Sequence, residues 1–372
     1  MRTAARVAIE HRDGEGLGRV TLQTVADAVG VSRMTVSNAF SRPDQLSPAL
    51  RERILATATE LGYSGPDPAA RALARGSAGA VGVVLTHSLG EAFLDPVAAA
   101  FFGAVAEELA PTGLAVSLIP AKSAGGKLAA RDLAIDAALV YACDGAYEAV
   151  EWLHRRKLPI ISVDREPDPG DRAIRLDERE GGRLAAQHLI DLGHTDIAIF
   201  TINPSVAGHG WAADVDVELA NHVAHERRRG AVDALAAAGL TPRLFHVNDN
   251  YDRYVSAGAE ALARDPARPS AVVCFSDFIA AALVAAAQRA GLDVPGDLSV
   301  VGFDDSPIAS AVTPQLTTVE QDFVAKGRAA ARALIEALEA SRSGSAATIS
   351  TEDIIIPVSL VVRASTGEPR AS

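Results

Sequence analysis

The sequence predicts an all-α helix-turn-helix domain at the N-terminal end, a short linker that contains the helix-forming run AARALAR, and a larger α/β domain whose two halves each contain a parallel sheet. Three observations predict this fold class. Apolar residues recur at steps of three and four between residues 20 and 63, with one break at a glycine. Residues 64–79 are rich in Pro, Ala and Gly. From residue 80 onward, Val- and Ile-rich runs alternate with helical segments, as in parallel sheets covered on both faces.

Three helices are expected within residues 20–63. The apolar pattern breaks at Gly30, which predicts two short helices joined by a tight turn. Thr21 and Ser32 are suited to cap these helices, and Ser47 before a proline predicts the start of a third helix that ends at Gly62. The second helix should present side chains suited to a DNA major groove, namely Ser32, Arg33, Met34, Ser37 and Asn38.

The charge is divided unevenly along the chain. Residues 1–78 contain ten Arg and no Lys against eight Asp and Glu, which gives +2. Since the whole chain has 35 basic and 47 acidic residues, the remainder carries 25 basic and 39 acidic groups, or −14. The acidity therefore belongs to the larger domain. Attraction to phosphates must come from arginines focused on one face, or from two chains acting together.

The composition limits the class of protein. The chain has 372 residues, 48% hydrophobic and 22% charged, which is ordinary for a globular protein of two or three domains. No run of about 18 apolar residues occurs, and residues 1–19 lack the apolar core and cleavage site of a signal peptide. We expect a cytoplasmic protein without membrane association, in which residues 1–19 form a disordered arm.

The larger domain is predicted from two similar series of strands and helices. The strands of the first series are AVGVVL, LAVSLIP, AALVYA and PIISVD, and those of the second are DIAIF, LFHV, AVVCF and LSVVGF. Ligands of open parallel sheets bind beyond the carboxyl ends of the strands. The polar and aromatic residues at those ends are Thr86, His87, Ser88, Tyr141, Asp164, Arg165, Asn203, Ser276, Asp277, Phe278, Asp304 and Asp305.

No catalytic residues, metal site or cofactor are predicted. The sequence has no GxSxG, HExxH or Walker motif and no GxGxxG after a strand, so we expect a protein that is not an enzyme. His209, His222 and His225 with Asp214 and Asp216 do not have the spacing of a known ligand set. Cys143 and Cys274 lie in or beside apolar runs, where we expect small buried side chains.

Several spaced motifs resemble one protein family. The runs VADAVGVSRMTVSNAF, LSPALRERILATATELGY and ARALARG resemble the DNA-binding domain and hinge of the LacI/GalR (lactose-repressor) family of bacterial transcription regulators. The resemblance extends almost to the C-terminus and is missing at residues 1–19, in an insert near 205–225 and in the last few residues. It implies a periplasmic-binding-protein-like larger domain, with a cleft between two halves that binds a small-molecule effector.

The resemblance also implies domain boundaries. We expect a DNA-binding domain at 20–63, a hinge at 64–79, an effector-binding and dimerisation domain at 80–365, and a tail at 366–372. The hinge would contain a short hinge helix, whereas its composition without the resemblance would favour a plain linker. The first half would comprise about 80–176 and 322–345, and the second about 177–320 and 350–363. After TPQLTTVEQ the chain would cross back, so that the helix FVAKGRAAARALIEALEA rejoins the first half and the strand IIIPVSLVVR the second.

For DNA, the resemblance implies a homodimer that binds a palindromic operator. Leu73 occupies the place of the hinge leucine that enters the minor groove, with Ala70 on the same face and Arg71 and Arg75 near phosphates. Asn38 departs from the arginine usual in the family and suits adenine or a phosphate. The implied DNA-binding residues are Thr21, Gln23, Ser32, Arg33, Met34, Ser37, Asn38, Ala70, Arg71, Leu73 and Arg75.

For the effector, the resemblance places Asp164 in the first half opposite Arg227 of an RxxG motif in the second. Ser276 stands where the family usually has Asn, which removes an amide from the site. Trp211, in the insert, is a further candidate for stacking on a ligand. The expected effector-binding residues are Ser88, Tyr141, Asp164, Trp211, Arg227, Ser276, Asp277, Phe278, Asp304, Gln321 and Phe323.

The nature of the effector stays open. Carboxylates, an arginine fork and aromatic faces suit a sugar, and they would also suit a nucleoside of the kind bound by the purine-type members of the family. A transport-type sugar-binding protein would share the fold, but that class lacks a helix-turn-helix head. We expect a ligand-controlled repressor, favour a sugar over a nucleoside, and leave open whether the ligand releases the protein from DNA or is needed for binding.

Overall fold

The computed structural model describes residues 20–85, 89–123, 125–141, 147–203, 205–214, 219, 222–248, 252–343 and 351–370. It divides into two compact units, Met1–Ala78 and Gly79–Ser372, which are considered separately. The predicted arm at 1–19 lies outside the described residues, and so do Thr86, His87, Ser88, Cys143 and Asp216. Within the described part of the chain, no helix is long and apolar enough to cross a membrane.

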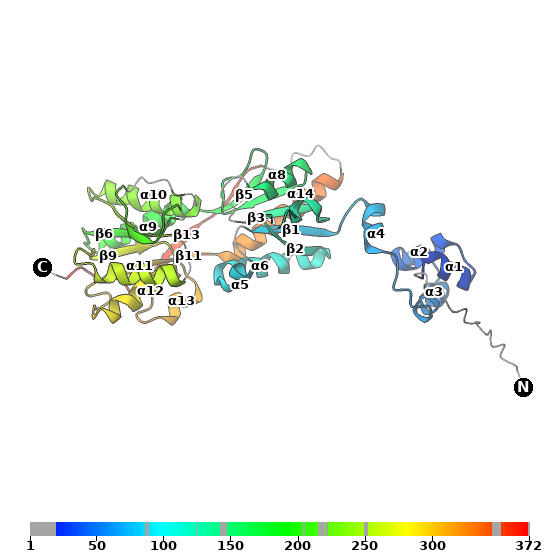
Figure 1. Ribbon diagram of the computed structural model, residues 1–372, viewed down its shortest axis with the longest axis horizontal. Coiled ribbons are helices and arrows are strands. Elements are labelled where there is room, and N and C mark those ends of the chain that lie inside the picture. Colours follow the sequence, from blue (N-terminus) through cyan, green and yellow to red (C-terminus); the bar gives the residue numbers. More distant parts are fainter. Residues whose placement is uncertain are drawn as a thin grey trace, which may run out of the picture. The chain divides into compact units, whose positions relative to one another are not determined.

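The smaller unit contains the three helices predicted within residues 20–63 and the expected hinge helix (Figure 1). Its elements are α1 (Leu22–Val29), α2 (Arg33–Ser41), the 3-10 turn η1 (Pro43–Gln45), α3 (Pro48–Glu60) and α4 (Pro68–Arg75). The predicted caps are confirmed, because the Thr21, Ser32 and Ser47 side chains accept hydrogen bonds from the backbone N–H groups of the first turns. Gly30 ends α1 in the left-handed conformation, with φ of 76°.

A small apolar core holds α1, α2 and α3 together. Its fully buried residues come from all three helices, and they are Val25, Ala26, Val36, Ala39, Ile54 and Ala58. Phe40 and Tyr63 close one side, with ring centroids 5.7 Å apart. This core fixes the orientation of α2 and leaves its first turn, at Arg33 and Met34, exposed.

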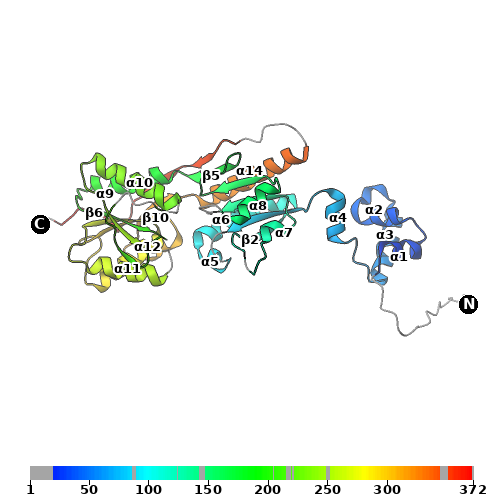
Figure 2. The ribbon, with the colours of Figure 1, turned by 45° about the horizontal axis from the view of Figure 1, so that its top comes forward.

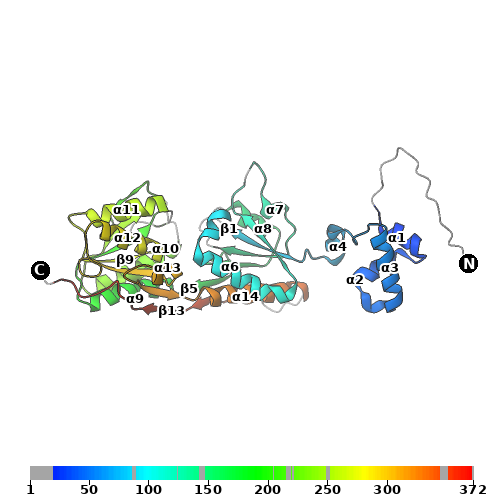
Figure 3. The ribbon, with the colours of Figure 1, turned by 90° about the horizontal axis from the view of Figure 1, so that it is seen from below.

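The first half of the larger unit is a six-stranded sheet with the order β12-β5-β4-β3-β1-β2. All its neighbouring strands are parallel. The strands are β1 (Ala80–Leu85), β2 (Ala115–Pro120), β3 (Ala137–Tyr141), β4 (Ile160–Val163), β5 (Arg172–Leu176) and β12 (Ile354–Ile356). The helices are α5 (Leu89–Leu94), α6 (Pro96–Leu109), α7 (Ala129–Asp132), α8 (Glu148–Arg155) and α14 (Phe323–Ser343), with the 3-10 turn η2 (Ala110–Thr112). Figure 3 shows α6 and α14 on one face of this sheet and α7 and α8 on the other.

The second half is a seven-stranded sheet with the order β13-β11-β10-β9-β6-β8-β7. Its strands are β6 (Ile197–Ile202), β7 (His209–Trp211), β8 (Arg243–Val247), β9 (Ala271–Cys274), β10 (Ser299–Asp304), β11 (Thr317–Gln321) and β13 (Val358–Val361). Its helices are α9 (Glu178–Asp191), α10 (His222–Ala237), α11 (Asp252–Arg264), α12 (Asp277–Arg289) and α13 (Pro307–Ala311). Figure 2 shows α9 and α10 on one face and α11 and α12 on the other.

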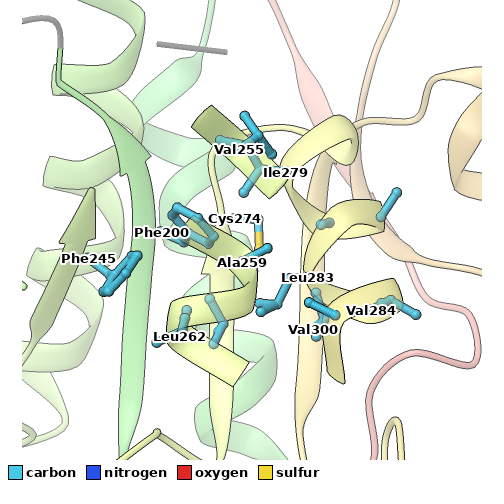
Figure 4. Packing of buried hydrophobic residues seen from close by; sticks show 14 of the residues in the cluster. Phe200, Phe245, Val255, Ala259, Leu262, Cys274, Ile279, Leu283, Val284 and Val300 are labelled. Atoms are coloured by element: carbon cyan, nitrogen blue, oxygen red, sulfur yellow. The ribbon is translucent and has the colours of Figure 1, made fainter. Parts of the chain in front are cut away.

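The predicted fold class is confirmed, with one qualification for the second sheet. Its central strands are parallel, but β13 pairs antiparallel with β11 at one edge and β7 pairs antiparallel with β8 at the other. The core between this sheet and helices α11 and α12 is built from aliphatic side chains around Phe200, and it includes the buried Cys274 (Figure 4). Burial raises the pKa of the Cys274 thiol well above its usual value, as expected for a small apolar core residue.

The predicted strand IIIPVSLVVR is corrected by the structure. The resemblance implies that the whole segment lies in the second half, but Ile354–Ile356 pairs in parallel with β5 of the first sheet, and only Val358–Val361 joins the second. Pro357 separates the two strands, because it has no N–H to continue a ladder. Asp353 anchors the segment to the first half through an ion pair with Arg175, at 2.5 Å between Oδ2 and Nη2.

Three short segments connect the two halves within the described part of the chain. They follow β5, β11 and β12, where the chain passes to α9, α14 and β13 respectively. The segments that follow β5 and β12 are in contact, since the Asp177 N–H donates to the Ile356 carbonyl at 3.1 Å. Short parallel connections of this kind allow two rigid halves to rotate about one another.

Candidate functional site

Arg227 lies at the centre of a buried set of charged side chains, on the first turns of α10. Its Nε donates to Glu178 Oε2 at 2.6 Å, and its Nη1 donates to the Phe275 carbonyl at 2.7 Å. Nη1 also lies 3.4 Å from Asp304 Oδ1. The guanidinium carbon is 3.5 Å from the centroid of the Phe303 ring, which adds a cation–π contact. These four contacts together fix the orientation of the Arg227 guanidinium group.

Glycines bring Arg227 to this place. α9 and α10 cross in close contact, and a Cβ on Gly230 would lie 1.8 Å from the Arg179 carbonyl oxygen. A Cβ on Gly182 would lie 1.9 Å from the carbonyl oxygen of Arg227 itself. The close packing of α9 against α10 thus requires the glycine of the RxxG motif, and this packing positions Arg227.

Asp304 ends β10 beside Arg227 and is 8% exposed. Its backbone has φ of 115°, a conformation that few residues other than glycine adopt. Burial raises the pKa of Asp304 to about 8, against the opposing effect of Arg227. A carboxyl group that titrates near neutrality can accept or donate a hydrogen bond toward a ligand hydroxyl.

Gln321 and Lys326 join Asp304 to the first half. Gln321 Nε2 donates to Asp304 Oδ1 at 2.5 Å, and its Oε1 lies 3.3 Å from Lys326 Nζ. Lys326, on α14, is only 1% exposed and donates to Asp164 Oδ2 at 2.6 Å. We call the set Asp164, Lys326, Gln321, Asp304, Arg227 and Glu178 the charged cluster. It forms one hydrogen-bonded chain from the first sheet to the second.

Asp164 follows β4 and has φ of 53°, in the left-handed region that Asp tolerates better than most residues. Its Oδ1 is buried and makes no hydrogen bond among the described residues, and the same holds for Glu178 Oε1. Buried acceptors without a partner are costly, and they become favourable when a ligand supplies donors. The two oxygens lie in different halves of the unit.

An aromatic wall lies beside the cluster in the first half. The Tyr141 ring, at the end of β3, stacks on Phe101 with centroids 4.9 Å apart and meets Phe102 edge-on at 5.2 Å. Burial raises the pKa of Tyr141 well above its usual value, and the carboxylates of Asp164 and Asp304 raise it further. Tyr141 is therefore a neutral phenol in electrostatic contact with charged groups of both halves.

Three other predicted site residues have structural contacts in the second half. The Ser276 side chain caps α12 by accepting from the Ile279 N–H, and Phe278 packs against the apolar core. Asp277 is fully buried, accepts from the Ser306 N–H at 2.7 Å and from Thr318 Oγ1 at 2.5 Å, and thereby holds the turn after Asp304. Burial raises the pKa of Asp277 to about 6.

Trp211 is not brought to the charged cluster. It lies on the edge strand β7, where its Nε1 donates to Asp265 at 2.7 Å and Arg243 stacks on its ring at 4.2 Å. Arg243 begins β8, and Asp265 follows the end of α11, so these contacts lie at the amino end of the sheet. Phe323, half-buried, begins α14 two residues after Gln321.

Sequence reasoning missed Lys326, Glu178 and Phe101. Each lies on a helix rather than at the end of a strand, so the strand-end rule does not select it. Lys326 carried a detectable signal, since it stands on the otherwise apolar and alanine-rich face of α14 that packs against α6. A lone lysine on a buried helical face needs a buried anion as a partner.

The side chains predicted to contact DNA come from the ends and surfaces of α1, α2 and α4. Arg33 and Met34 are exposed on the first turn of α2, and Met34 is 69% exposed although apolar. Ser37 and Asn38 are half-buried, and Asn38 Nδ2 donates to Gln45 Oε1 at 3.2 Å. Gln23 is exposed on α1, while the Thr21 side chain is committed to the capping box.

The hinge segment is helical as α4, and its leucine is unburied. Leu73 is 86% exposed, a large value for an aliphatic side chain. Ala70, Arg71 and Arg75 are also exposed. An isolated helix of only eight residues, with its leucine exposed, is not expected to be stable in water. This composition indicates a surface that becomes buried against a partner.

Comparison with protein families gives two matches. Residues 21–65 match the bacterial regulatory proteins of the lacI family, and residues 186–366 match the periplasmic binding protein-like domain. An HTH-type transcriptional regulator of Mycolicibacterium smegmatis is 36% identical over 337 residues, covering 85% of this chain and 90% of the relative. The HTH-type transcriptional repressor PurR of Photobacterium profundum is 29% identical over 333 residues, covering 85% and 91%. These relatives are named as transcriptional regulators and not as enzymes.

Solved structures give the same result for the fold. A complex of the transcriptional regulator CelR with cellobiose matches with a TM-score of 0.64 and 27% identity, covering 93% of this chain and 100% of that chain. The lac repressor dimer bound to operator and an anti-inducer matches with a TM-score of 0.73 at 23% identity, covering 94% and 99%.

Proposed function

The chain belongs to the lacI family of bacterial regulatory proteins and is a DNA-binding transcriptional regulator; from this premise we propose that it is a repressor that binds a palindromic operator as a homodimer. Its affinity for DNA is controlled by a small molecule bound at the charged cluster. Support for the dimer comes from the lac repressor, which is a dimer on its operator. Support for a sugar ligand comes from CelR, whose structure contains cellobiose.

The main support for a ligand at the charged cluster is that two of its buried carboxylate oxygens accept no hydrogen bond from the residues that the structure describes. Asp164 Oδ1 in the first half and Glu178 Oε1 in the second are buried without hydrogen bonds among the described residues. The cations Lys326 and Arg227 are already paired with carboxylates at 2.6 Å each. The cluster therefore offers acceptors rather than free cations, which favours a neutral, hydroxyl-bearing ligand such as a sugar over an anion.

The proposed control follows from the connections between the halves. A ligand that is held by Asp164 from one side and by the Arg227 and Asp304 region from the other fixes the angle between two halves joined by three short segments. The first half continues directly into α4 and the DNA-binding helices along the chain. A ligand can shift DNA affinity only by its differential affinity for the two angles, typically about 1–3 kcal/mol.

The purine-type repressors are the alternative for the ligand, since PurR is among the relatives. A thermal-shift screen of sugars and nucleosides on the purified chain separates the two classes, because a bound ligand stabilises by RT ln(1 + [L]/Kd). We expect stabilisation by a sugar or related polyol. Stabilisation by nucleobases or nucleosides alone would replace the sugar proposal by the purine-type one.

Arg33→Ala tests the proposed reading of operator bases. Arg33 is exposed on the first turn of α2, where a guanidinium can donate two hydrogen bonds to a guanine. We expect a loss of about 1–3 kcal/mol in operator binding, confined to sequences with the preferred base at one position of each half-site. The measurement is a titration of operator variants. An equal loss on all sequences would show that Arg33 contacts only phosphate.

Leu73→Ala tests the role of α4. Because Leu73 is 86% exposed, its removal should not affect folding of the free protein. We expect weaker operator binding and less DNA bending, since the variant lacks the apolar wedge but keeps the groove contacts of α2. Bending is measured by fluorescence energy transfer across the operator. Unchanged bending would mean that α4 is only a linker.

A further inference from the structure

His154, Asp168 and Asp171 converge on one point of the first half, outside the charged cluster. His154 lies in the last turn of α8, and the two aspartates lie in the loop between β4 and β5. His154 Nε2 is 3.4 Å from Asp168 Oδ2 and 3.5 Å from Asp171 Oδ2. One ligand atom from each of the three residues can be chosen so that all lie within 4.8 Å of one another.

The two aspartates are held by a tight turn. Asp168, Pro169, Gly170 and Asp171 form a four-residue turn in which the Asp171 N–H donates to the Asp168 carbonyl at 2.9 Å. Gly170 has φ of 95°, and a proline followed by a glycine with positive φ is the arrangement of a type II turn. The turn presents the first and fourth side chains together, and both are carboxylates.

Asp171 is buried, yet one of its carboxylate oxygens has no hydrogen-bond donor in the described part of the chain. Its side chain is only 7% exposed, and its Oδ2 makes no hydrogen bond among the described residues. That oxygen faces His154 Nε2 and shares the site with a second carboxylate. A buried carboxylate oxygen without a hydrogen-bond donor is costly, and a bound cation would satisfy it.

We propose that His154, Asp168 and Asp171 bind a divalent transition metal, with Zn²⁺ as the preferred ion. Imidazole nitrogen and carboxylate oxygen are both ligand types that Zn²⁺ accepts, and three protein ligands leave a fourth position for water. Ligands about 2.0–2.2 Å from a tetrahedral zinc are separated by roughly 3.3–3.6 Å. The two separations from His154 Nε2, 3.4 Å to Asp168 Oδ2 and 3.5 Å to Asp171 Oδ2, fall in this range.

Arg165 is a further charged group at the site, and its contacts affect the binding of a cation. Its Nη1 lies 3.1 Å from Asp168 Oδ2 and 3.1 Å from Ser162 Oγ, and the side chain is 7% exposed. An arginine bonded to a ligating carboxylate orients that ligand, as outer partners of metal sites do. Its positive charge also lowers the affinity for a cation, so we expect a moderate and saturable site rather than a permanent structural one.

Arg165 also places the site next to the charged cluster, because it directly follows Asp164 in the chain. The proposal is nevertheless independent of the proposed effector and operator functions. Metal binding at the loop between β4 and β5 is measured without DNA or sugar.

The test is a calorimetric titration of Zn²⁺ into the full chain, free of affinity tags and treated with a chelator. We expect one saturable equivalent per chain. His154→Ala and Asp171→Asn should each weaken that binding about tenfold or more. His225→Ala is the matched control, since it removes another histidine of a helix that lies 3.8 Å from a carboxylate, and it should bind Zn²⁺ as the wild type does.

Thermal unfolding with and without Zn²⁺ is the second measurement, and it covers variants that fold less well. The wild type and His225→Ala should melt at a higher temperature with the metal, whereas His154→Ala and Asp171→Asn should not respond. The absence of a saturable equivalent in the wild type would overturn the proposal. So would equal affinity in the wild type and both site variants.

Discussion

Replacing Gly230 by alanine should destabilise the larger unit by about 3 kcal/mol or more. A Cβ at this position would lie 1.8 Å from the Arg179 carbonyl oxygen, and its second neighbour is also backbone. Backbone atoms cannot rotate away, so α9 and α10 must separate. Urea unfolding followed by tryptophan fluorescence measures the effect, because Trp152 and Trp211 both lie in the larger unit.

Gly103→Ala is the matched control for this experiment. Gly103 is also in a helix, α6, but nothing lies within 4 Å of the position of its missing Cβ. Alanine there should be neutral or stabilising by about 0.5–1 kcal/mol, since glycine lowers helix stability. Equal stability of Gly230→Ala and Gly103→Ala would show that the close crossing of α9 and α10 is not required.

The second large effect is expected at Lys326. Replacing it by methionine leaves Asp164 buried without its cation, and breaking a buried ion pair in this way typically costs about 3–5 kcal/mol. The pair is well buried, with side chains 1% and 8% exposed and 2.6 Å between Nζ and Oδ2. Urea unfolding of Lys326→Met should show this loss.

The double variant Lys326→Met with Asp164→Asn should recover most of the loss, since no charge is then left unpaired. Asparagine suits position 164, because it tolerates the left-handed conformation that this residue adopts, with φ of 53°. A double variant no more stable than Lys326→Met would show that the ion pair is not what makes Lys326 important.

Local signals in the sequence were sufficient for the smaller unit. Thr21, Ser32 and Ser47 cap helices as predicted, because a cap depends only on residues within one turn of it. The strands with continuous apolar runs were also predicted, since burial on both faces gives a strand a run of apolar residues that is visible in its own sequence. The strands β5 and β7 were missed, because RAIRL and HGW lack such a run.

Pairing between distant segments could not be predicted in the same way. The division of residues 354–361 between two sheets depends on β5 and β11, which lie far away in the sequence. The sequence contained Pro357 as a hint of an interruption, but not the identity of the two partners. The antiparallel edge strands of the second sheet could not be predicted for the same reason, since tertiary contacts determine the direction in which an edge strand pairs.

The candidate site was predicted in part. Tyr141 and Asp164 lie together because the neighbouring parallel strands β3 and β4 end at one edge of the first sheet, and Asp304 ends a strand of the second sheet. Arg227 was identified by its motif, and the structure adds the reason for the glycine in that motif. Lys326 and Glu178 were missed because they lie on helices, whose packing brings them to the cluster, and the strand-end rule does not select helical residues. Trp211 was chosen for its residue type and lies elsewhere, in contact with Asp265 and Arg243.

The central claim is that a small molecule at the charged cluster controls binding to DNA. The most direct measurement is a titration of operator DNA with and without the ligand found in the thermal-shift screen, using the wild type and the Asp164→Asn, Lys326→Met variant. In the wild type the ligand should change operator affinity by roughly 5- to 150-fold. The variant should bind operator with nearly unchanged affinity and show no ligand response. A full ligand response in the variant would contradict the account and place the effector site elsewhere in the chain.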